Sequence, residues 1–317
     1  MRAARVERYG PPEVIEVVES PAPVAGAGQV LVRVHVAAVT SADARIRSAT
    51  FPRGFGLPAR LAFGIRRPRR PVLGSAYAGV VDSVGSGVSA FAVGDRVTGM
   101  TGLHMGAHAE LLAVSADKVA ALRSGVSDSD AAGALFGGTT ALYFLRDRGG
   151  IAPGMSVLVN GATGAIGTNA VQLARHFGAE VTAVCSTANA PLAAELGAAR
   201  VIDYTTTDLG SIPDRFDLVL DAVGNLTIAS GRRLLADGGK LLLAVADLAD
   251  TLRARGDVAA GSSKERVSDI DLLLALLEDG SLRTVIDGSF PLEAIVDAHR
   301  RVDTGHKVGN VLVTIPA

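Results

Sequence analysis

Three glycines, Gly161, Gly164 and Gly167, lie within the stretch 155–174, which reads MSVLVNGATGAIGTNAVQLA. The apolar run before them predicts a buried strand, and the apolar spacing after them predicts a helix. In such a unit the first glycine makes the tight turn, the second lets the backbone approach a pyrophosphate, and the third lets the helix pack against the strand. Free N–H groups at the helix start attract phosphate charge. The chemistry indicated is dinucleotide binding through Gly161, Ala162, Thr163, Gly164, Ala165, Ile166 and Gly167.

The residues after the next strand, 181–185, bear on which dinucleotide binds. An NAD site places Asp or Glu at the end of this strand, where the carboxylate accepts from the ribose 2′-hydroxyl. Here the sequence continues Ser186, Thr187, Ala188, Asn189, with no acid. Small hydroxyls can donate to a 2′-phosphate, so we predict NADPH, contacted by Ser186 and Thr187. The same hydroxyls are also typical of a helix N-cap, and one residue can both contact the phosphate and cap the helix.

The sequence contains few residues that could ligate a metal. Cys185 is the only cysteine, which excludes an internal disulfide and any multi-cysteine zinc or iron–sulfur cage, and we expect it to be a small buried side chain at a strand end. His104, His108 and Glu110 have a spacing that superficially suggests ligands. Residues 106–111, however, fit a strand that places 108 and 110 on one face and leaves 104 beyond a glycine. We therefore expect no metal site.

The elements that position these residues change in character near residue 125. Before it, short strands separated by Gly and Pro are typical of a small antiparallel barrel or sandwich; they are 30–36, 78–84 and 96–99. After it, a helix capped by Asp128 or Ser129 opens an alternation of strands and helices, which predicts a parallel sheet covered on both faces. The expected strands are 156–160, 180–185, 201–203, 218–221 and 240–245, with a helix at 166–177. The tail predicts helices 269–277 and 292–302 and a strand 310–315.

The bulk composition restricts the partners. The chain has 317 residues, a net charge of −1, 4% aromatic residues and no Trp, so neither nucleic acid nor a membrane is an expected partner. The start, MRAARVERYG, lacks the apolar centre of a signal peptide, and no apolar run reaches the roughly 18 residues of a membrane span. A cytoplasmic location is the expectation.

One segment, 51–71, carries six arginines among glycines and prolines: Arg53, Arg60, Arg66, Arg67, Arg69 and Arg70. One interpretation is an exposed loop whose charge is solvated. The other is a basic lip beside the entrance for cofactor or substrate.

Taken together, motifs over nearly the whole chain resemble the medium-chain dehydrogenase/reductase superfamily, in its zinc-free quinone oxidoreductase branch. They are RYGPPEV at 8–14, PVLG at 71–74, VGDRV at 93–97, the NGATGAIG turn at 160–167, VIDY at 201–204, DAVG at 221–224 and GHKVGN at 305–310. The resemblance implies an α/β protein with two domains. A GroES-like β-barrel domain would comprise 1–124 with 288–317, a Rossmann domain 125–287, and the active site the cleft between them.

The resemblance also implies roles for single residues. Thr40 and Ser41 become candidate catalytic residues beside the nicotinamide. Further candidate cofactor contacts are Thr140, Tyr204, Val223, Gly224 and Lys307. For three of these a plainer role is open: Thr140 as a helix threonine bonded to the preceding turn, Tyr204 as a surface residue, and Lys307 as a solvated lysine.

This sequence departs from its relatives in two respects. Zinc alcohol dehydrogenases carry an early Cys ligand and a Gly-His-Glu lead, whereas this chain has Val39-Thr40-Ser41 and Gly74-Ser75-Ala76. A tetrahedral zinc set needs three or four such ligands, so zinc-dependent alcohol oxidation is not expected. Ala188 and Asn310 stand where relatives often have basic residues, which loosens the expected preference for NADPH.

Without a metal, a nicotinamide can still reduce an acceptor whose developing oxygen charge is delocalised, such as a quinone or an α,β-unsaturated carbonyl. We therefore predict a zinc-independent NADPH-dependent reductase of such acceptors, with a homodimer expected from relatives. The alternatives are an NADPH-dependent 2-enoyl thioester reductase and a non-catalytic NADPH-binding redox sensor. A short-chain dehydrogenase is not favoured, because no tyrosine has a lysine four residues later.

Overall fold

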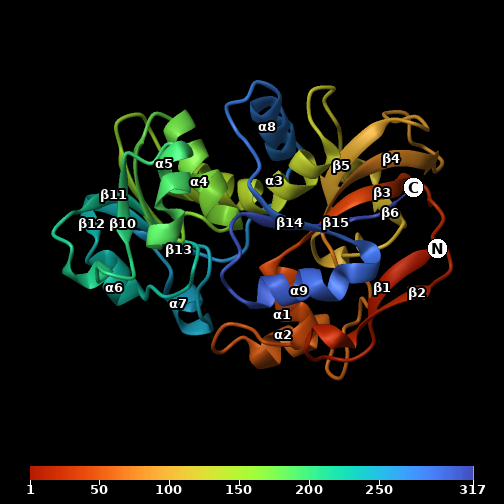
Figure 1. Ribbon diagram of the computed structural model, residues 1–317, viewed down its shortest axis with the longest axis horizontal. Coiled ribbons are helices and arrows are strands. Elements are labelled where there is room, and N and C mark those ends of the chain that lie inside the picture. Colours follow the sequence, from red (N-terminus) through yellow and green to blue (C-terminus); the bar gives the residue numbers. More distant parts are fainter. Residues whose placement is uncertain (317) are drawn as a thin grey trace. The chain divides into compact units, whose positions relative to one another are not determined.

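The computed structural model describes residues 1–316. Their contacts divide the chain into two units (Figure 1). Unit 1 comprises Met1–Phe51, Gly56–Phe136 and the residues from Glu265 onward; unit 2 comprises Pro52–Phe55 and Gly137–Lys264. Residues 125–136 and 265–287 thus pack with unit 1, although the sequence analysis grouped them with the Rossmann domain. The division into functional domains stays a prediction.

Unit 1 is built around a seven-stranded sheet in the order β14-β15-β3-β4-β5-β7, with β6 paired to β3. Its strands are β3 (Gln29–Val39), β4 (Ala76–Val84), β5 (Arg96–Met100), β6 (Leu111–Ser115), β7 (Val119–Ala121), β14 (Ile286–Pro291) and β15 (Asn310–Thr314). All pairs are antiparallel except β14 with β15. A separate antiparallel pair joins β1 (Arg2–Val6) to β2 (Ile15–Glu19). Val30, Val32 and Val34 of β3 lie in the apolar core of this unit, as the alternation predicts.

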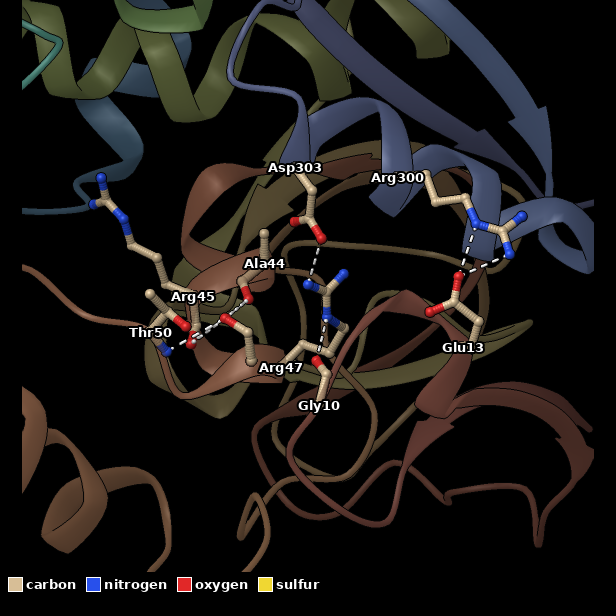
Figure 2. A network of polar contacts seen from close by, with 9 residues as sticks. Gly10, Glu13, Ala44, Arg45, Arg47, Thr50, Arg300 and Asp303 are labelled. Carbon is tan, nitrogen blue, oxygen red and sulfur yellow. Dashed lines mark hydrogen bonds and ion pairs between the residues drawn. The ribbon is translucent and has the colours of Figure 1, made fainter.

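The helices of unit 1 are α1 (Ser41–Ser48), α2 (Gly56–Phe63), α8 (Val267–Glu278) and α9 (Ile295–Asp303). Figure 2 shows how α1 is tied to α9: the buried Arg47 donates from Nη2 to Asp303 Oδ2 at 2.6 Å and from Nε to the Gly10 carbonyl at 3.2 Å. Nearby, Arg300 of α9 donates to Glu13 at 2.9 Å. Because Arg47 is buried, its pairing with Asp303 offsets a large desolvation cost. The two bonds of Arg47 fix α1 against α9 and Gly10, and the first turn of α1 follows Thr40.

Unit 2 is a six-stranded parallel sheet in the order β10-β9-β8-β11-β12-β13. Its strands are β8 (Ser156–Asn160), β9 (Glu180–Cys185), β10 (Arg200–Asp203), β11 (Phe216–Asp221), β12 (Leu235–Leu243) and β13 (Val258–Ala260). Strand order reverses after β8, and α4 (Ala165–His176) and α5 (Ala190–Glu195) lie on the face opposite α6 (Ile228–Arg232) and α7 (Leu248–Arg253) (Figure 1). This is the doubly wound arrangement expected of a Rossmann domain, so the predicted parallel sheet is confirmed.

The helix that begins near residue 125 is α3 (Asp128–Leu142), followed by a π-helical turn at Tyr143–Gly149. The predicted cap at Asp128 or Ser129 is wrong by one residue. Ser127 Oγ accepts from Asp130 N at 3.0 Å and donates to the Asp130 carboxylate, as an N-cap does. An N-cap hydroxyl accepts from the N–H three residues later, and only Ser127 has this relation to Asp130 at the start of α3.

The predicted strand at 106–111 is also wrong. The strand, β6, begins only at Leu111, and within 106–110 Ala109 makes no more than an isolated bridge to Ala3. The N–H groups of 106–108 donate to the carbonyls of Leu73 and Gly74. Gly106 has φ +104°, which ends the extended conformation. His108 and Glu110 therefore do not share a strand face.

No helix within residues 1–316 is long and apolar enough to span a membrane.

Candidate cofactor site

The glycine turn between β8 and α4 has the geometry that its sequence predicts. Gly161 has φ +81°, and its N–H donates to Val184 O at 3.2 Å, so the chain leaves β8 in a turn that disfavours other residues. At Gly167 an added Cβ would lie 2.1 Å from the Gly161 carbonyl oxygen. A helix bearing any side chain there could not pack against the turn. Both structural roles assigned to these glycines are confirmed.

Gly164 differs from the other two glycines. Its φ of −79° is open to any residue, and an added Cβ would meet only the Gly161 oxygen, at 3.6 Å. The protein leaves space on this side of the turn, at the N-cap of α4. Gly164 is the N-cap of α4, and no side chain of the described residues makes a capping hydrogen bond there. The first N–H groups of a helix have no acceptor within the helix itself. The turn therefore offers backbone donors and the positive end of a helix to an anionic group.

A second turn, between β9 and α5, lies against the first. Asn189 Nδ2 donates to Thr163 Oγ1 at 3.3 Å, which ties the two turns together. Ser186 occupies the N-cap position of the short helix Thr187–Asn189 but makes no side-chain cap bond within the described chain. Sequence reasoning missed Asn189 as a site residue. Its signal was the polar amide in the STAN string after β9.

The structure places a carboxylate beside Thr187. β10 runs parallel to β9 with Asp203 opposite Cys185, and Thr187 Oγ1 donates to Asp203 Oδ2. Thr205 donates to the same carboxylate through Oγ1 at 2.7 Å and N at 2.8 Å. These hydrogen bonds lower the pKa of Asp203, so it carries its charge at neutral pH. The stretch after β9 contains no acid, but the neighbouring strand supplies one.

Replacing Asp203 by Asn is expected to raise the affinity for NADPH relative to NADH about 3- to 10-fold. The removed charge would repel a 2′-phosphate near Thr187, and a neutral 2′-hydroxyl is not repelled. Isothermal titration of both nucleotides measures the ratio. Asp208→Asn, which alters the cap of the next short helix at 209–211, serves as the control. An unchanged ratio in Asp203→Asn would show that the 2′ end lies elsewhere.

The loop after β11 is organised by Asp221, which is fully buried. Its carboxylate accepts from the N–H groups of Val223, Gly224 and Leu226 at 2.9, 3.1 and 3.0 Å, and from Asn160 Nδ2 at 2.9 Å. Burial raises the pKa of Asp221, and these donors offset part of that rise. The two predicted cofactor residues in this loop are therefore held by a residue that sequence reasoning did not single out.

The loop also touches the glycine turn. An added Cβ on Gly161 would lie 2.6 Å from Val223 Cγ2, and Gly224 has φ +90°. Val223 itself is 49% exposed, so its side chain is available to a ligand. The carboxyl ends of β8, β9 and β11 thus bring together Gly161, Thr163, Thr187 and Val223, at the edge where such sheets bind ligands.

Thr140 and Tyr204 also belong to unit 2. Thr140 is buried, and its Oγ1 lies 3.4 Å from Ser263 Oγ, a partner that the helix-threonine interpretation did not foresee. One turn earlier, an added Cβ on Gly137 would lie 2.0 Å from Ala165 O, so α3 packs directly on the start of α4. Tyr204 follows β10 with 52% of its surface exposed.

Thr40 and Ser41 lie in unit 1, at the start of α1. The Thr40 hydroxyl donates to Asp43 Oδ2 at 2.6 Å and accepts from Asp43 N at 3.3 Å, which makes it the helix cap. Asp43 in turn accepts from Gly74 N at 2.9 Å. Ser41 is exposed, and no side-chain hydrogen bond is formed by it within residues 1–316. Of the two candidates, Ser41 therefore has the exposed hydroxyl, whereas the Thr40 hydroxyl is committed to the helix cap.

Lys307 also lies in unit 1 and is not a freely solvated lysine. Its Nζ donates to Gly309 O at 2.5 Å, and burial lowers its pKa to about 8. Its neighbour Asn310 is buried and donates to Val285 O at 3.1 Å. Contact of Lys307 with a cofactor stays a prediction.

The fold and these turns define a class: a dinucleotide-binding, doubly wound domain joined to a barrel-like β domain. Two family models match the chain, the alcohol dehydrogenase GroES-like domain over residues 26–124 and the zinc-binding dehydrogenase over 196–313. A 2-methylene-furan-3-one reductase from Solanum lycopersicum is 31% identical over 327 residues, covering 99% of this chain and 79% of the reductase. The chain belongs to the medium-chain dehydrogenase/reductase superfamily, in its quinone oxidoreductase branch. The expected fold class is thereby confirmed.

Solved structures agree. A quinone oxidoreductase from Coxiella burnetii has a TM-score of 0.89 at 27% identity, covering 100% of this chain and 99% of that one. A mycobacterial protein complexed with NADPH has a TM-score of 0.82 at 27% identity, covering 99% and 100%. The chain also matches a polyketide synthase of Streptomyces halstedii, 32% identical over 262 residues, but spans only 5% of its length (78% of this chain).

The word zinc in one family description does not fit the residues of this chain. At the positions where zinc relatives carry their ligands, Thr40 is used as a helix cap and Ser75 is a buried hydroxyl. His108 is buried with Nε2 at 3.1 Å from Ala38 O, whereas Glu110 is bonded to Arg2. Residues 1–316 contain no group of three or more His, Cys, Asp or Glu that could hold a metal ion.

Proposed function

We propose that this chain is an NADPH-dependent reductase that transfers hydride, without zinc, to a quinone or an α,β-unsaturated carbonyl. The observation that carries the proposal is the open N-terminus of α4 at Gly164, flanked by the turns that end β9 and β11. Backbone N–H groups there suit a pyrophosphate, and the Ser186 hydroxyl, which makes no cap bond, suits the ribose end; Thr187 lies beside it with its hydroxyl bonded to Asp203. The NADPH complex of the mycobacterial relative supports the cofactor.

The acceptor class follows from the protein groups at hand. A bound nicotinamide supplies the hydride, and the protein binds, orients and provides donors. When hydride adds to an enone or quinone, negative charge develops on an acceptor oxygen that is already conjugated, and a proton from solvent completes the reduction. Hydroxyl and backbone donors suffice for such an oxygen, whereas a simple ketone needs a stronger acid or a metal. The names of the tomato and Coxiella relatives support the same acceptors.

Ser41→Ala is expected to lower kcat up to about 10-fold with no change in NADPH affinity or stability, because one donor to the acceptor oxygen is lost. Thr40→Ala is the matched contrast: loss of the cap costs about 1 kcal/mol of unfolding free energy. Steady-state kinetics and thermal unfolding of both variants separate the two roles. Unchanged kcat in Ser41→Ala would remove Ser41 from the reaction.

The function itself is tested by the NADPH absorbance of the purified protein with a panel of quinones and enones in the presence of a chelator. Chelator-resistant oxidation of NADPH, faster than of NADH, supports the proposal. NADPH binding without turnover on any acceptor would favour the redox sensor. No binding of either nucleotide would overturn the cofactor assignment.

A 2-enoyl thioester is the second candidate acceptor. The match to part of a polyketide synthase is the observation that favours it. Turnover of an enoyl thioester far above that of every quinone and simple enone would select it.

A further inference from the structure

The segment 56–71 of unit 1, which we call the α2 platform, presents apolar side chains to solvent. One face of α2 is anchored: Ala59 is buried, and the ring of Phe63 stacks on Phe51 with centroids 5.7 Å apart. Leu57 and Leu61, four residues apart, share another face and are 72% and 55% exposed. Ile65, just beyond the helix, is 63% exposed. Three large aliphatic side chains therefore face water on α2 and the loop that follows it. Figure 1 shows where α2 lies in unit 1.

The loop that follows α2 is held in a defined conformation. Gly64 has φ +128°, and an added Cβ would lie 1.9 Å from Arg67 O. Gly64 N donates to Arg60 O at 2.9 Å and Arg69 N to Phe63 O at 2.6 Å, so the loop folds back on the helix end. Pro68 is buried. The side chains between these anchors therefore project from a fixed backbone.

The α2 platform is strongly basic. It contains no acidic residue and five arginines, all exposed: Arg60, Arg66, Arg67, Arg69 and Arg70. Arg67 pairs with Glu7 at 3.3 Å, and Arg60 lies 5.1 Å from the Tyr9 ring centroid. For the other three guanidinium groups the described chain provides neither a hydrogen bond nor an ion pair. This local excess of positive charge exists in a chain whose net charge is −1.

We propose that the α2 platform docks on the surface of a membrane that contains anionic lipids. Aliphatic side chains beside guanidinium groups match the boundary between acyl chains and phosphate headgroups, where both chemistries meet within about 5–10 Å. Each basic residue near such a surface adds attraction, which salt weakens. The proposal revises the expectation of no membrane partner, which rested on the charge of the whole chain. It does not depend on the proposed reductase activity.

Cosedimentation of the full chain with vesicles tests the proposal. At low ionic strength the protein is expected to bind vesicles containing phosphatidylserine at least about 10-fold more tightly than pure phosphatidylcholine vesicles, and added salt should release it. Equal affinity for both vesicles, or none for either, would overturn the proposal.

Two sets of variants assign the binding to the α2 platform. The triple change Leu57→Ser, Leu61→Ser, Ile65→Ser should weaken binding at least about 10-fold, whereas Val24→Ser with Val93→Ser, at residues 83% and 66% exposed elsewhere in unit 1, should not. Glutamine at Arg66, Arg69 and Arg70 should weaken binding and flatten its salt dependence.

The control for charge is glutamine at the exposed Arg233, Arg253 and Arg255 of unit 2. Thermal unfolding verifies that every variant is folded. If the serine variant binds vesicles as the wild type does while the glutamine variant does not, the surface recognises charge alone. That outcome would overturn docking at the acyl-chain boundary and leave electrostatic adsorption to an anionic surface.

Discussion

Gly164→Asp is expected to abolish NADPH binding, with affinity reduced at least about 100-fold, while the fold is kept or slightly stabilised. Gly164 is the N-cap of α4 with φ −79° and ψ −179°, a conformation in which Asp is a favoured cap. The new carboxylate would occupy the open side of the turn and repel the pyrophosphate from the N–H groups that α4 offers. Nucleotide fluorescence titration and thermal unfolding measure the two effects separately.

Three further variants sharpen the result. Gly164→Asn keeps the size of Asp without its charge, so its affinity for NADPH separates the steric from the electrostatic part. Gly164→Ala should fold normally, because its Cβ would meet only the Gly161 oxygen at 3.6 Å. Gly167→Ala should instead fail to fold, because its Cβ would lie 2.1 Å from that oxygen. Wild-type affinity in Gly164→Asp would place the cofactor away from this turn.

Asp221→Ala is expected to lower the unfolding free energy by about 3–5 kcal/mol and to weaken NADPH binding at least about 10-fold. Removing the carboxylate leaves three buried backbone N–H groups without their acceptor, and it leaves the Asn160 amide with only its second acceptor, Asn225 Oδ1 at 2.6 Å. The loop that carries Val223 and Gly224 would then lose its conformation. Asp221→Asn should have a stability and an NADPH affinity between those of the wild type and Asp221→Ala. One of its two oxygen positions becomes an NH₂ group, which cannot accept from Leu226 N.

Asp217 provides the control on the same strand. Its carboxylate accepts from Ser156 N and Oγ at 2.8 Å each, near the start of β11 and therefore at the opposite edge of the sheet from Asp221. Asp217→Ala should lower the melting temperature but leave the NADPH affinity of the folded protein unchanged. If both variants weaken NADPH binding equally, Asp221 acts through stability alone and does not position the loop.

What the sequence by itself determined is local in the chain. The strand, turn and helix of 156–176 are contiguous: an apolar run that is almost wholly buried leads into the glycine turn, and a helix follows directly, so their types could be recognised from the sequence. The positive φ at Gly161 and the close packing at Gly167 follow from the same short stretch.

Local patterns failed where two interpretations satisfied them equally. Residues 106–111 alternate as a strand does, but their N–H groups donate to the carbonyls of Leu73 and Gly74, and Gly106 turns the chain. At the start of α3, Asp128 and Ser129 were the predicted caps, whereas hydrogen-bond geometry selects Ser127, one residue earlier. In both places a hydrogen bond decided the structure, and the spacing of apolar and polar residues does not show which hydrogen bonds form.

Only the tertiary structure decided which polar groups meet across the sheet. The parallel register of β9 and β10 sets Asp203 opposite Cys185 and beside Thr187, so an acid reaches the proposed nucleotide site from a neighbouring strand. The carboxylate of Asp221 faces Asn160 across β8 and β11 for the same reason. Such partners are more than ten residues apart, and their meeting depends on strand order and register, which no local periodicity encodes.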